Sequence, residues 1–349
     1  MKQPHSMQIP EPRTMAERKR GHIEAVLSGR TQARIDAGFE VLRFEHCALP
    51  ELDLDAINLS TCFLGKHLKL PFLISSMTGG QSGAERINAC LAEAAQTLGI
   101  ALGVGSQRIA LAEGGFAGID RSLRRRAPDI ALYGNIGAAQ LRRDYNSADL
   151  QRALEMIEAD ALIVHLNPLQ EALQEAGDTC WSGLLGKLEC LCAELPLPVI
   201  VKEVGFGISA PLAVRLASCG VAAVDVAGAG GTSWSAVEGA MSNDPKRAAL
   251  AELFRDWGIP TATALREVRA ALPALPIIGS GGIRNGLDAA KAIRLGADLV
   301  GQAGGLLHAA VSGTEAVLSH FAQLEATLRR VCFATGARDL AALKRVRLL

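Results

Sequence analysis

The chain has 349 residues and a formal net charge of zero; 49% of its residues are apolar and 4% are aromatic. The neutral charge gives no indication of a nucleic-acid or membrane-surface partner, and the few aromatic side chains argue against platforms that stack bases. The length fits one large α/β domain or two smaller ones, so any anionic ligand must be bound by a local cluster of residues.

Eight cysteines are scattered along the chain without a C-x-x-C pair. We expect reduced thiols, because no signal peptide is apparent and a chain of this length does not need a disulfide framework. No apolar run reaches the ~18 residues that a membrane-spanning helix requires. The sequence therefore predicts a cytoplasmic protein without a membrane partner.

The first 70 residues lack the regular alternation of the remaining chain. Residues 1–34 are polar and predict an N-terminal arm, and residues 39–70 predict an irregular cap with short strands. We expect this segment, 1–70, to pack on a single catalytic domain formed by residues 71–349.

Eight short apolar runs then alternate with Ala- and Leu-rich stretches. The runs are 71–74, 100–103, 130–133, 161–164, 198–201, 221–224, 276–279 and 298–301. Strands that alternate with helices indicate parallel βαβ units, and runs that are apolar throughout are typical of strands buried on both faces. Eight such units predict a (β/α)₈ TIM barrel.

The stretches between the runs carry helical signals. Residues 84–98 have apolar side chains at helical spacing and precede Gly99, which suits a C-terminal cap. Residues 287–295, before Gly296, follow the same pattern. We expect residues 181–195 to form the helix after the fourth strand, and 232–259 to form a long loop after the sixth, as a lid or binding loop.

Active sites of α/β barrels form where the strands end. Gly281-Gly282 after the seventh strand and Ala303-Gly304 after the eighth stand where such barrels bind phosphate, and Thr232 follows the sixth strand. These loops predict a phosphate-bearing cofactor. Lys202 directly follows the fifth strand; it faces either an anionic cofactor such as a flavin or a structural partner, Glu203 or Asp225.

Polar residues follow the fourth strand more densely than a turn requires. The stretch HLNPLQE from His165 supplies His, Asn, Gln and Glu, although Asn-Pro alone would form a turn. His165 is either a site residue or a satisfied histidine at the barrel mouth. A basic cluster at residues 18–22 is either a solvated helix start or a phosphate clamp on the arm. No Rossmann, P-loop or zinc pattern occurs.

Taken together, these residues resemble the type 2, FMN-dependent isopentenyl-diphosphate isomerases. The matching stretches are Arg18-Lys19 with His22, ALPELDLDAINLSTCFLGK from Ala48, ISSMTGG from Ile74, LGVGSQR from Leu102, NIGAAQL from Asn135, HLNPLQE from His165, VKEVGFGIS from Val201, DVAGAGGTSW from Asp225 and SGGIR from Ser280. GVGSQR, HLNPLQE and GAGGTSW are specific, whereas SGGIR occurs in many FMN barrels. Residues 1–17 lie outside the match.

The resemblance implies a role for each matched residue. The implied FMN contacts are Ser76, Met77, Thr78, Ser106, Asn135, Lys202, Thr232, Gly282, Ile283, Arg284, Ala303 and Gly304. The implied diphosphate contacts are Arg18, Lys19, Ser106, Gln107, Arg108 and Gln170, which also support the reading of the basic cluster as a clamp. The implied catalytic side chains are His165, Asn167 and Gln170, and Glu171 is the implied Mg²⁺ ligand.

The implied reaction moves a double bond, converting isopentenyl diphosphate to dimethylallyl diphosphate. A proton is added to the terminal alkene carbon and another leaves C2. The resemblance implies that reduced FMN is the acid–base group and that NADPH serves only to reduce it. It also implies a homo-oligomer, a tetramer or an octamer.

Three other interpretations can be weighed on the sequence. An FMN-dependent barrel oxidoreductase of the 2-hydroxy acid dehydrogenase type would leave Glu171 and the basic arm unexplained. An enzyme of the inosine-monophosphate dehydrogenase type needs a cysteine after SGGIR, where the next one is Cys332. A non-catalytic flavin- or diphosphate-binding protein would not need polar residues at every strand end.

Overall fold

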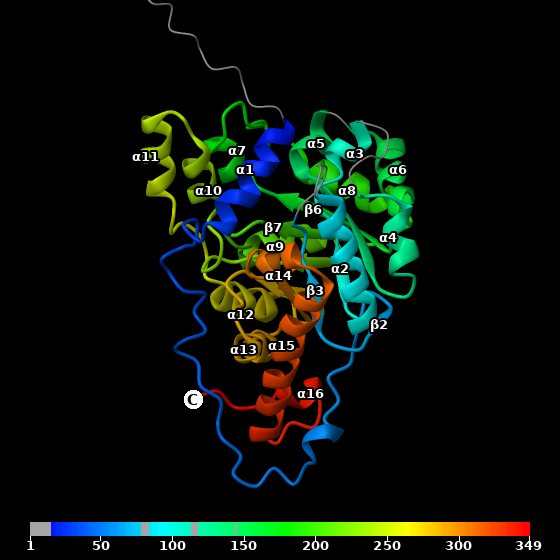
Figure 1. The fold of residues 1–349 in the computed structure, drawn as a ribbon, viewed down its shortest axis with the longest axis vertical. Helices are drawn as coiled ribbons and strands as arrows, with labels where there is room; N and C mark the ends of the chain where they lie inside the picture. Colours follow the sequence, from blue (N-terminus) through cyan, green and yellow to red (C-terminus); the bar gives the residue numbers. More distant parts are fainter. Residues whose placement is uncertain (1–14, 78–83, 113–117, 144) are drawn as a thin grey trace, which may run out of the picture.

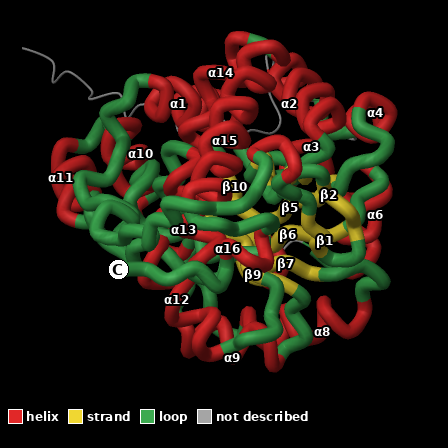
Figure 2. Tube along the Cα trace, turned by 90° about the horizontal axis from the view of Figure 1, so that it is seen from below, coloured by secondary structure: helices red, strands yellow, loops and turns green. Residues whose placement is uncertain are grey.

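The structure is a computed structural model that describes residues 15–77, 84–112, 118–143 and 145–349. Eight parallel strands close into a barrel in the order β10-β3-β4-β5-β6-β7-β8-β9, which confirms the predicted (β/α)₈ fold. The strands are β3 Phe72–Ile74, β4 Ala101–Gly103, β5 Leu132–Gly137, β6 Ala161–Leu166, β7 Val199–Glu203, β8 Ala223–Asp225, β9 Ile277–Ser280 and β10 Leu299–Gln302. Figure 2 shows these strands surrounded by helices.

Several strands extend beyond their apolar runs, and β5, β6 and β7 do so by two residues or more. β5 continues through Asn135, β6 through His165 and β7 through Lys202, and the register places His165 beside Lys202 and Lys202 beside Asp225. Strand pairing uses backbone N–H and C=O groups. A residue with a polar side chain therefore still belongs to a strand wherever the neighbouring strand also continues. The polar residues therefore sit on paired strands instead of in loops.

A small hairpin closes the end of the barrel at which the strands begin. Strands β1 (Thr61–Phe63) and β2 (Lys66–Leu68) pair antiparallel. Phe63 and Leu68 are fully buried and pack with inward-facing residues of the barrel strands, among them Tyr133 and Ile200. This apolar plug leaves only the carboxyl ends of the strands for polar chemistry.

Helices surround the barrel and form its extensions. They are α1 Met15–Leu27, η1 Leu54–Ala56, α2 Ala84–Leu98, α3 Arg108–Ala112, α4 Arg121–Arg126, α5 Ala138–Arg143, α6 Ser147–Ile157, α7 Pro168–Leu173, α8 Leu184–Glu194, α9 Ala210–Ser218, α10 Trp234–Met241, α11 Pro245–Leu253, α12 Thr261–Ala271, α13 Gly286–Arg294, η2 Gly304–Leu306, α14 Leu307–Ser312, α15 Thr314–Ala334 and α16 Leu340–Leu343. No helix of the described segments has the length and apolar character needed to cross a bilayer.

Several predicted helices are confirmed and others differ. α2 has the predicted bounds, and Gly99 follows it at φ +63°. The helix expected over 181–195 begins only at Leu184, because Gly183 has φ +79°. It is preceded by α7, where Pro168 occupies the first turn. The long loop expected after the sixth strand instead folds into α10 and α11, whose N-termini are capped by Ser233 and Asp244.

The N-terminal helix lies over the carboxyl ends of the strands. In Figure 1, α1 crosses the upper half of the molecule beside α10. After α1 the chain pairs with the loop that follows β8, through a bridge between Gln32 and Thr232. Farther along, Phe44 bridges to Leu348 near the C-terminus. The first part of the chain therefore contacts the top of the barrel as well as its lower side.

An arginine clamp fixes the start of β5. Arg124 of α4 donates to the carbonyl oxygens of Ala127 and Ile130, at 3.2 and 3.0 Å, and its guanidinium pairs with Asp160 at 2.8 Å. Asp160 also accepts the N–H of Leu132, the first residue of β5, at 2.9 Å. Burial acts to raise the pKa of Asp160, but hydrogen bonds from Lys66, from the N–H of Leu132 and from Arg124 lower it below its usual value. The clamp thus connects the C-terminal end of α4, the first residue of β5 and the residue that precedes β6.

The same arrangement occurs at the start of β9. Arg269 of α12 donates to the carbonyl oxygens of Leu272 and Leu275, at 3.3 and 2.9 Å, and pairs with Asp298 at 2.7 Å. Asp298 accepts the N–H of Ile277 at 2.9 Å. In the barrel order β5 and β9 stand on opposite sides.

We expect Arg269→Ala to lower the free energy of unfolding by about 2 kcal/mol, because several carbonyl groups and a half-buried carboxylate lose their donor together. Chemical denaturation would measure the change. Arg266→Ala, on the exposed face of the same helix, is the control and should change stability by less than about 0.5 kcal/mol. Equal effects of the two substitutions would contradict a specific role for the clamp.

Candidate active site

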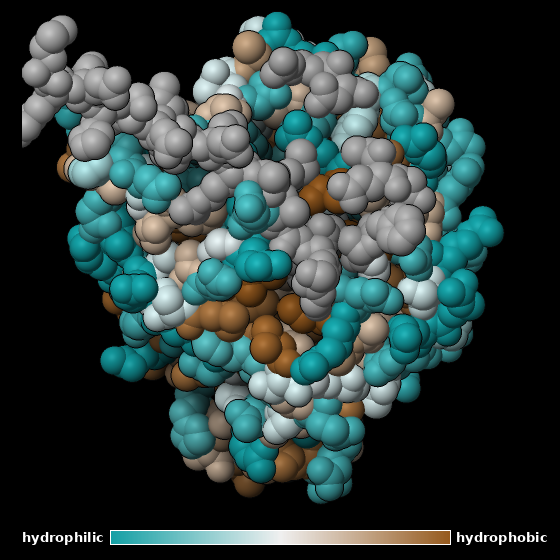
Figure 3. Space-filling model, turned by 45° about the horizontal axis from the view of Figure 1, so that its top comes forward, coloured by the Kyte–Doolittle hydropathy of each residue, from teal (hydrophilic) through white to brown (hydrophobic). Residues whose placement is uncertain are grey.

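A cavity of about 330 Å³ opens at the carboxyl ends of the barrel strands. Its lining comes from the last residues of the strands, from the loops that follow them, and from Lys19, His22, Ile23 and Val26 of α1. Figure 3, in which the top of Figure 1 is turned toward the viewer, shows apolar surface near the middle of this side with polar surface around it. The cavity is thus bounded by both the barrel and the N-terminal helix.

Every described residue of the predicted cofactor set lines this cavity. These residues are Ser76, Met77, Ser106, Asn135, Lys202, Thr232, Gly282, Ile283, Arg284, Ala303 and Gly304. Thr78 lies outside the described residues. The predicted catalytic side chains His165, Asn167 and Gln170 line the cavity as well, together with Lys19. Residues from both ends of the chain are therefore brought to one place.

Three predicted diphosphate contacts lie apart from the cavity lining. Gln107 is fully buried, and its amide donates to the carbonyl of Ala153 at 2.7 Å and accepts the N–H of Asn135 at 2.9 Å. Arg108 is exposed at the start of α3. Arg18 donates to the carbonyl of Glu175 at 3.3 Å. For Gln107 the reason is clear, because backbone groups already occupy both ends of its amide.

A backbone cradle forms one end of the cavity. The N–H groups of Gly282 and Ile283 make no hydrogen bond within the described part of the chain. Gly282 has φ +67°, and a Cβ there would lie 2.7 Å from the carbonyl oxygen of Gly230. A Cβ at Gly304 would lie 2.5 Å from Oγ1 of Thr232. Consecutive unpaired N–H groups in a tight turn bind anions, so the cradle fits a phosphate.

Unpartnered polar atoms lie in the lining at the end of β3, the strand beside β10. The hydroxyl oxygens of Ser75 and Ser76 are buried and have no hydrogen-bond partner among the described residues. Both residues line the cavity, at the end of β3. Buried polar groups are normally paired, and a ligand with polar ring atoms would satisfy these two.

Lys202 is 8% exposed, and its ammonium donates to the backbone carbonyl of Glu203 at 2.6 Å. The Glu203 carboxylate is not the partner, because it accepts the N–H groups of Val204, Gly205 and Phe206 in the loop after β7. Burial raises the pKa of Glu203 to about 7 despite these bonds and the charge of Lys202. Glu203 therefore fixes the loop, and Lys202 remains directed at the cavity.

Asp225 provides a counter-charge beside Lys202. One carboxylate oxygen accepts the hydroxyl of Ser280 at 2.6 Å and the N–H of Ala227 at 3.2 Å. The other oxygen, Oδ2, is buried without a hydrogen-bond partner among the described residues. Burial raises the pKa of Asp225, while Lys202 acts in the opposite direction. The arrangement suits a residue that orients its neighbours at the end of β8.

His165 lines the cavity with a ring that its surroundings keep neutral. The amide nitrogen of Asn135 donates to the carbonyl of Val104 at 3.1 Å, so its oxygen is the acceptor for Nδ1 of His165 at 2.9 Å. Burial, together with the charges of Lys202 and Lys19, lowers the pKa of His165 to about 3. A neutral ring that donates from Nδ1 has its lone pair on Nε2.

We expect the His165 ring to stay neutral between about pH 5 and pH 9, because its pKa is depressed far below the ordinary value. Ring ¹⁵N shifts in labelled protein, assigned with His165→Asn, would show one protonated and one unprotonated nitrogen throughout. A protonation step near pH 6.5 would contradict this assignment. The same shift predicts a loss of stability as the pH falls from about 6.5 toward 3, since only the unfolded chain takes up the proton.

A second polar cluster joins three helices at the cavity edge. Gln170 of α7 donates to Glu238 of α10 at 2.9 Å, and Nε2 of His22 in α1 lies 3.1 Å from the same oxygen. His22 also meets Trp234 edge-on, with ring centroids 5.2 Å apart. Asn167 donates to Gln170 at 3.2 Å. The sequence motifs assigned no role to Glu238, although its spacing of four from Trp234 places both on one helix face.

The predicted metal ligand, Glu171, lies just outside the lining of the main cavity, bonded to Asn167, which belongs to that lining. One oxygen accepts the side chain of Asn167 at 3.0 Å, and the other accepts the N–H of Asp178 at 2.7 Å. Glu171 lines a neighbouring shallow hollow with Asp244 and Lys246. Among the described residues no three His, Cys, Asp or Glu side chains come together as a metal cluster. A single carboxylate fits Mg²⁺, which keeps several waters and takes ligands from a substrate phosphate.

Residues 153–348 match the sequence model of the family described as FMN-dependent dehydrogenase. Over 330 residues the chain is 63% identical to the isopentenyl-diphosphate delta-isomerase of Xanthobacter autotrophicus, and the match covers 94% of this chain and 96% of that protein. The chain belongs to the isopentenyl-diphosphate delta-isomerase family. This membership confirms the resemblance derived from the sequence motifs.

Other comparisons support the family and the fold. The isopentenyl-diphosphate delta-isomerase of Stutzerimonas stutzeri is 58% identical over 337 residues, covering 96% of this chain and 97% of that protein. An oxidised, active mutant of (S)-mandelate dehydrogenase has a TM-score of 0.67 at 20% identity, covering 94% of this chain and 96% of that chain. At that identity the likeness concerns the barrel alone. Within the family, the FMN-dependent sequence model and the phosphate cradle point to the same cofactor.

Proposed function

We propose that this protein isomerises isopentenyl diphosphate to dimethylallyl diphosphate, with FMN in the barrel cavity and Mg²⁺ on the diphosphate. The observation that carries the proposal is one cavity that joins a backbone phosphate cradle to a polar wall of Lys19, His165 and Gln170. The chain around that cavity is 63% identical to a protein named for this activity.

The residues of the cradle fit the phosphate end of FMN. Gly282 and Ile283 offer unpaired N–H groups, and Thr232 offers a hydroxyl beside Gly304. Ser75, Ser76 and Lys202 would meet the ring system at the strand ends. Bound, reduced flavin supplies the acid–base group of the proposed reaction. The buried ammonium of Lys202 favours negative charge on whatever ring lies against it.

The opposite wall would hold the substrate. Lys19 brings a cation to the cavity, with its ammonium 3.4 Å from the carbonyl of Ser106. Gln170 is held by Glu238, so its amide has a fixed orientation. His165 contributes a neutral ring, which can accept a hydrogen bond and does not itself become protonated. We propose that these side chains orient the diphosphate and the alkene, with Arg18 and Glu171-bound Mg²⁺ at the outer end.

Exclusion of water is the remaining requirement. An unactivated alkene is a poor base, so the proton donor must be close to it in a dry site. Ile23 and Val26 of α1 and Trp234 of α10 provide apolar cover over the cavity. The N-terminal helix thus contributes both charge and shielding.

The cofactor reductant and the assembly state follow from the family resemblance. We propose NADPH as the reductant that prepares the flavin, with no net redox change in the isomerisation. We also propose a cytoplasmic homo-oligomer, a tetramer or an octamer. Anaerobic turnover with a chemical reductant in place of NADPH, and light scattering of the purified protein, test these two points.

The proposed activity is tested anaerobically with FMN, Mg²⁺, NADPH and isopentenyl diphosphate in D₂O, followed by NMR. We expect dimethylallyl diphosphate that carries solvent deuterium, with the flavin still reduced at the end. Flavin that binds and is reduced without any isomer would overturn the proposal. Bleaching of oxidised flavin by 2-hydroxy acids would then favour the oxidoreductase class.

A further inference from the structure

One short segment joins α1 to the rest of the molecule. Residues 28–35 follow α1, and their backbone pairs with the loop after β8: Ser233 donates to the carbonyl of Thr31 and Ala33 donates to the carbonyl of Gly231, both at 2.8 Å. Gln32 bridges to Thr232 and itself lines the cavity. Besides the direct contacts of α1 with α10, the placement of α1 over the cavity therefore depends on how this segment is held.

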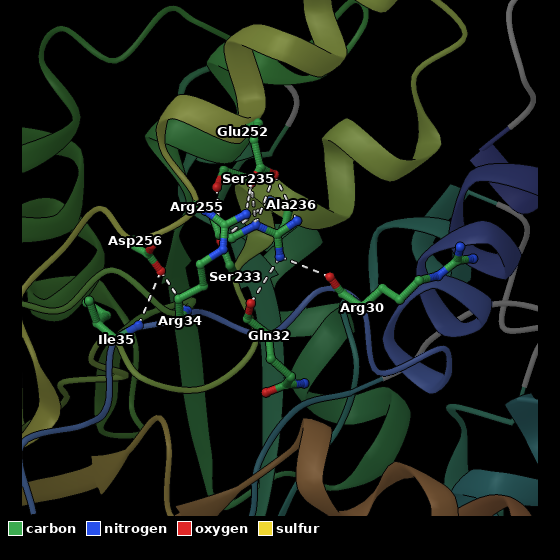
Figure 4. A network of polar contacts seen from close by, with 10 residues as sticks. All are labelled: Arg30, Gln32, Arg34, Ile35, Ser233, Ser235, Ala236, Glu252, Arg255 and Asp256. Atoms are coloured by element: carbon green, nitrogen blue, oxygen red, sulfur yellow. Dashed lines mark hydrogen bonds and ion pairs between the residues drawn. The ribbon is translucent and has the colours of Figure 1, made fainter.

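Three charged side chains at and just after the end of α11, Glu252, Arg255 and Asp256, contact that segment (Figure 4). Arg255 donates from Nη1 to the carbonyl oxygens of Arg30 and Gln32, at 2.9 and 3.0 Å. Its Nε lies 2.9 Å from both carboxylate oxygens of Glu252, and its side chain is 17% exposed. A planar guanidinium held on one edge by a carboxylate presents its other edge in a fixed direction.

Asp256 and Glu252 hold the same segment farther along the chain. Asp256 accepts the N–H groups of Arg34 and Ile35, at 2.6 and 3.3 Å. Glu252 also pairs with the guanidinium of Arg34. Nothing in the cavity chemistry uses Arg255 or Asp256, and neither residue lines the cavity. Among the described residues, the side chain of Asp256 bonds only to residues 34 and 35, and that of Arg255 bonds to residues 30 and 32 and to Glu252.

We propose that Arg255 is a positioning residue that keeps α1 docked over the cavity. Its two carbonyl contacts fix the chain on either side of Thr31, immediately after the helix that carries Lys19 and His22. Without the guanidinium, α1 spends part of its time undocked, and the apparent affinity for a ligand that needs α1 falls by the same fraction. The inference rests on the proposed function only in taking that ligand to be the diphosphate substrate.

The first test does not depend on activity. Arg18, Lys19 and Arg20 are trypsin sites within α1, and cleavage there requires the helix to leave its place. For Arg255→Ala we expect cleavage at these sites to be about 10-fold faster than in the wild type, with Arg255→Lys intermediate because an ammonium cannot span both carbonyls and the carboxylate. Arg266→Ala, exposed on α12, is the matched control and should leave the rate unchanged.

The second test uses kinetics of the FMN-loaded protein. We expect Arg255→Ala to raise the KM for isopentenyl diphosphate about 10-fold, with kcat and the FMN dissociation constant each within about twofold. Unchanged cleavage of α1 overturns the proposal, and so does cleavage that accelerates equally at sites throughout the barrel. If Arg255→Ala fails to fold, the same cleavage and kinetic measurements on Arg255→Lys and Asp256→Asn test the role of Arg255 in its place. A wild type without isomerase activity refutes the proposed function, while the cleavage result still decides the role of Arg255.

Discussion

Replacing Lys202 with Met is expected to lower kcat/KM at least about 100-fold, the loss typical of removing one charged group that faces developing charge. The ammonium is buried at the end of β7 and directed at the cavity, and the adjacent carboxylate of Asp225 has an oxygen with no hydrogen-bond partner among the described residues. Removing the cation leaves a buried negative charge beside the bound flavin. We also expect weaker FMN binding and a more negative flavin potential, measured by fluorescence quenching and anaerobic titration.

Lys291→Met is the matched control for this substitution. Lys291 is also a buried lysine, 7% exposed, and its ammonium also donates to a backbone carbonyl, that of Phe39 at 2.8 Å. It lies in α13, outside the cavity lining. We expect its loss to reduce stability without changing the flavin potential. Normal flavin occupancy and normal turnover in Lys202→Met would refute the role given to Lys202.

Replacing Glu171 with Gln is expected to raise the Mg²⁺ concentration for half-maximal activity by about 10-fold or more. The two carboxylate oxygens accept from Asn167 and from the N–H of Asp178, so Gln keeps the size of the side chain and can keep one of these two bonds, while it loses the charge. Because Glu171 lies outside the main cavity, FMN affinity should remain within about twofold of the wild-type value. Titration of Mg²⁺ under steady-state turnover measures the change.

Glu175→Gln serves as control for the metal assignment. Glu175 is exposed in the chain that follows α7, and the substitution removes the same charge from the same region. A similar Mg²⁺ shift in both variants would indicate a general effect of local charge. An unchanged Mg²⁺ requirement in Glu171→Gln would remove Glu171 from the proposed site.

The barrel could be predicted from the sequence because its strands are short, apolar throughout and regularly spaced. The helices after the sixth strand could not, since Ser233, Asp244 and the small residues between them are typical of loops as well as of helix caps. In the structure Ser233 and Asp244 cap α10 and α11. Local composition alone does not distinguish a capped helix from a polar loop.

The cofactor side of the site was more predictable than the substrate side. Gly282 and Gly304 are close to their strands in sequence, so strand ends place them directly. Glu238 was missed because its importance depends on Gln170 and His22, which reach it from two other helices. Gln107 was assigned to substrate from its motif, but only the three-dimensional structure shows that its amide is bonded between β5 and α6.

The two arginine clamps have a further consequence for the architecture of the barrel. Arg124 and Asp160 both belong to the first four barrel strands and their helices, whereas Arg269 and Asp298 both belong to the last four. Each half-barrel thus contains a complete clamp of its own, related to the other by an approximate twofold axis along the barrel. The two clamps repeat at the end of the barrel where the strands begin, while the two halves differ at the cavity end, where the phosphate cradle comes from one half and HLNPLQE from the other.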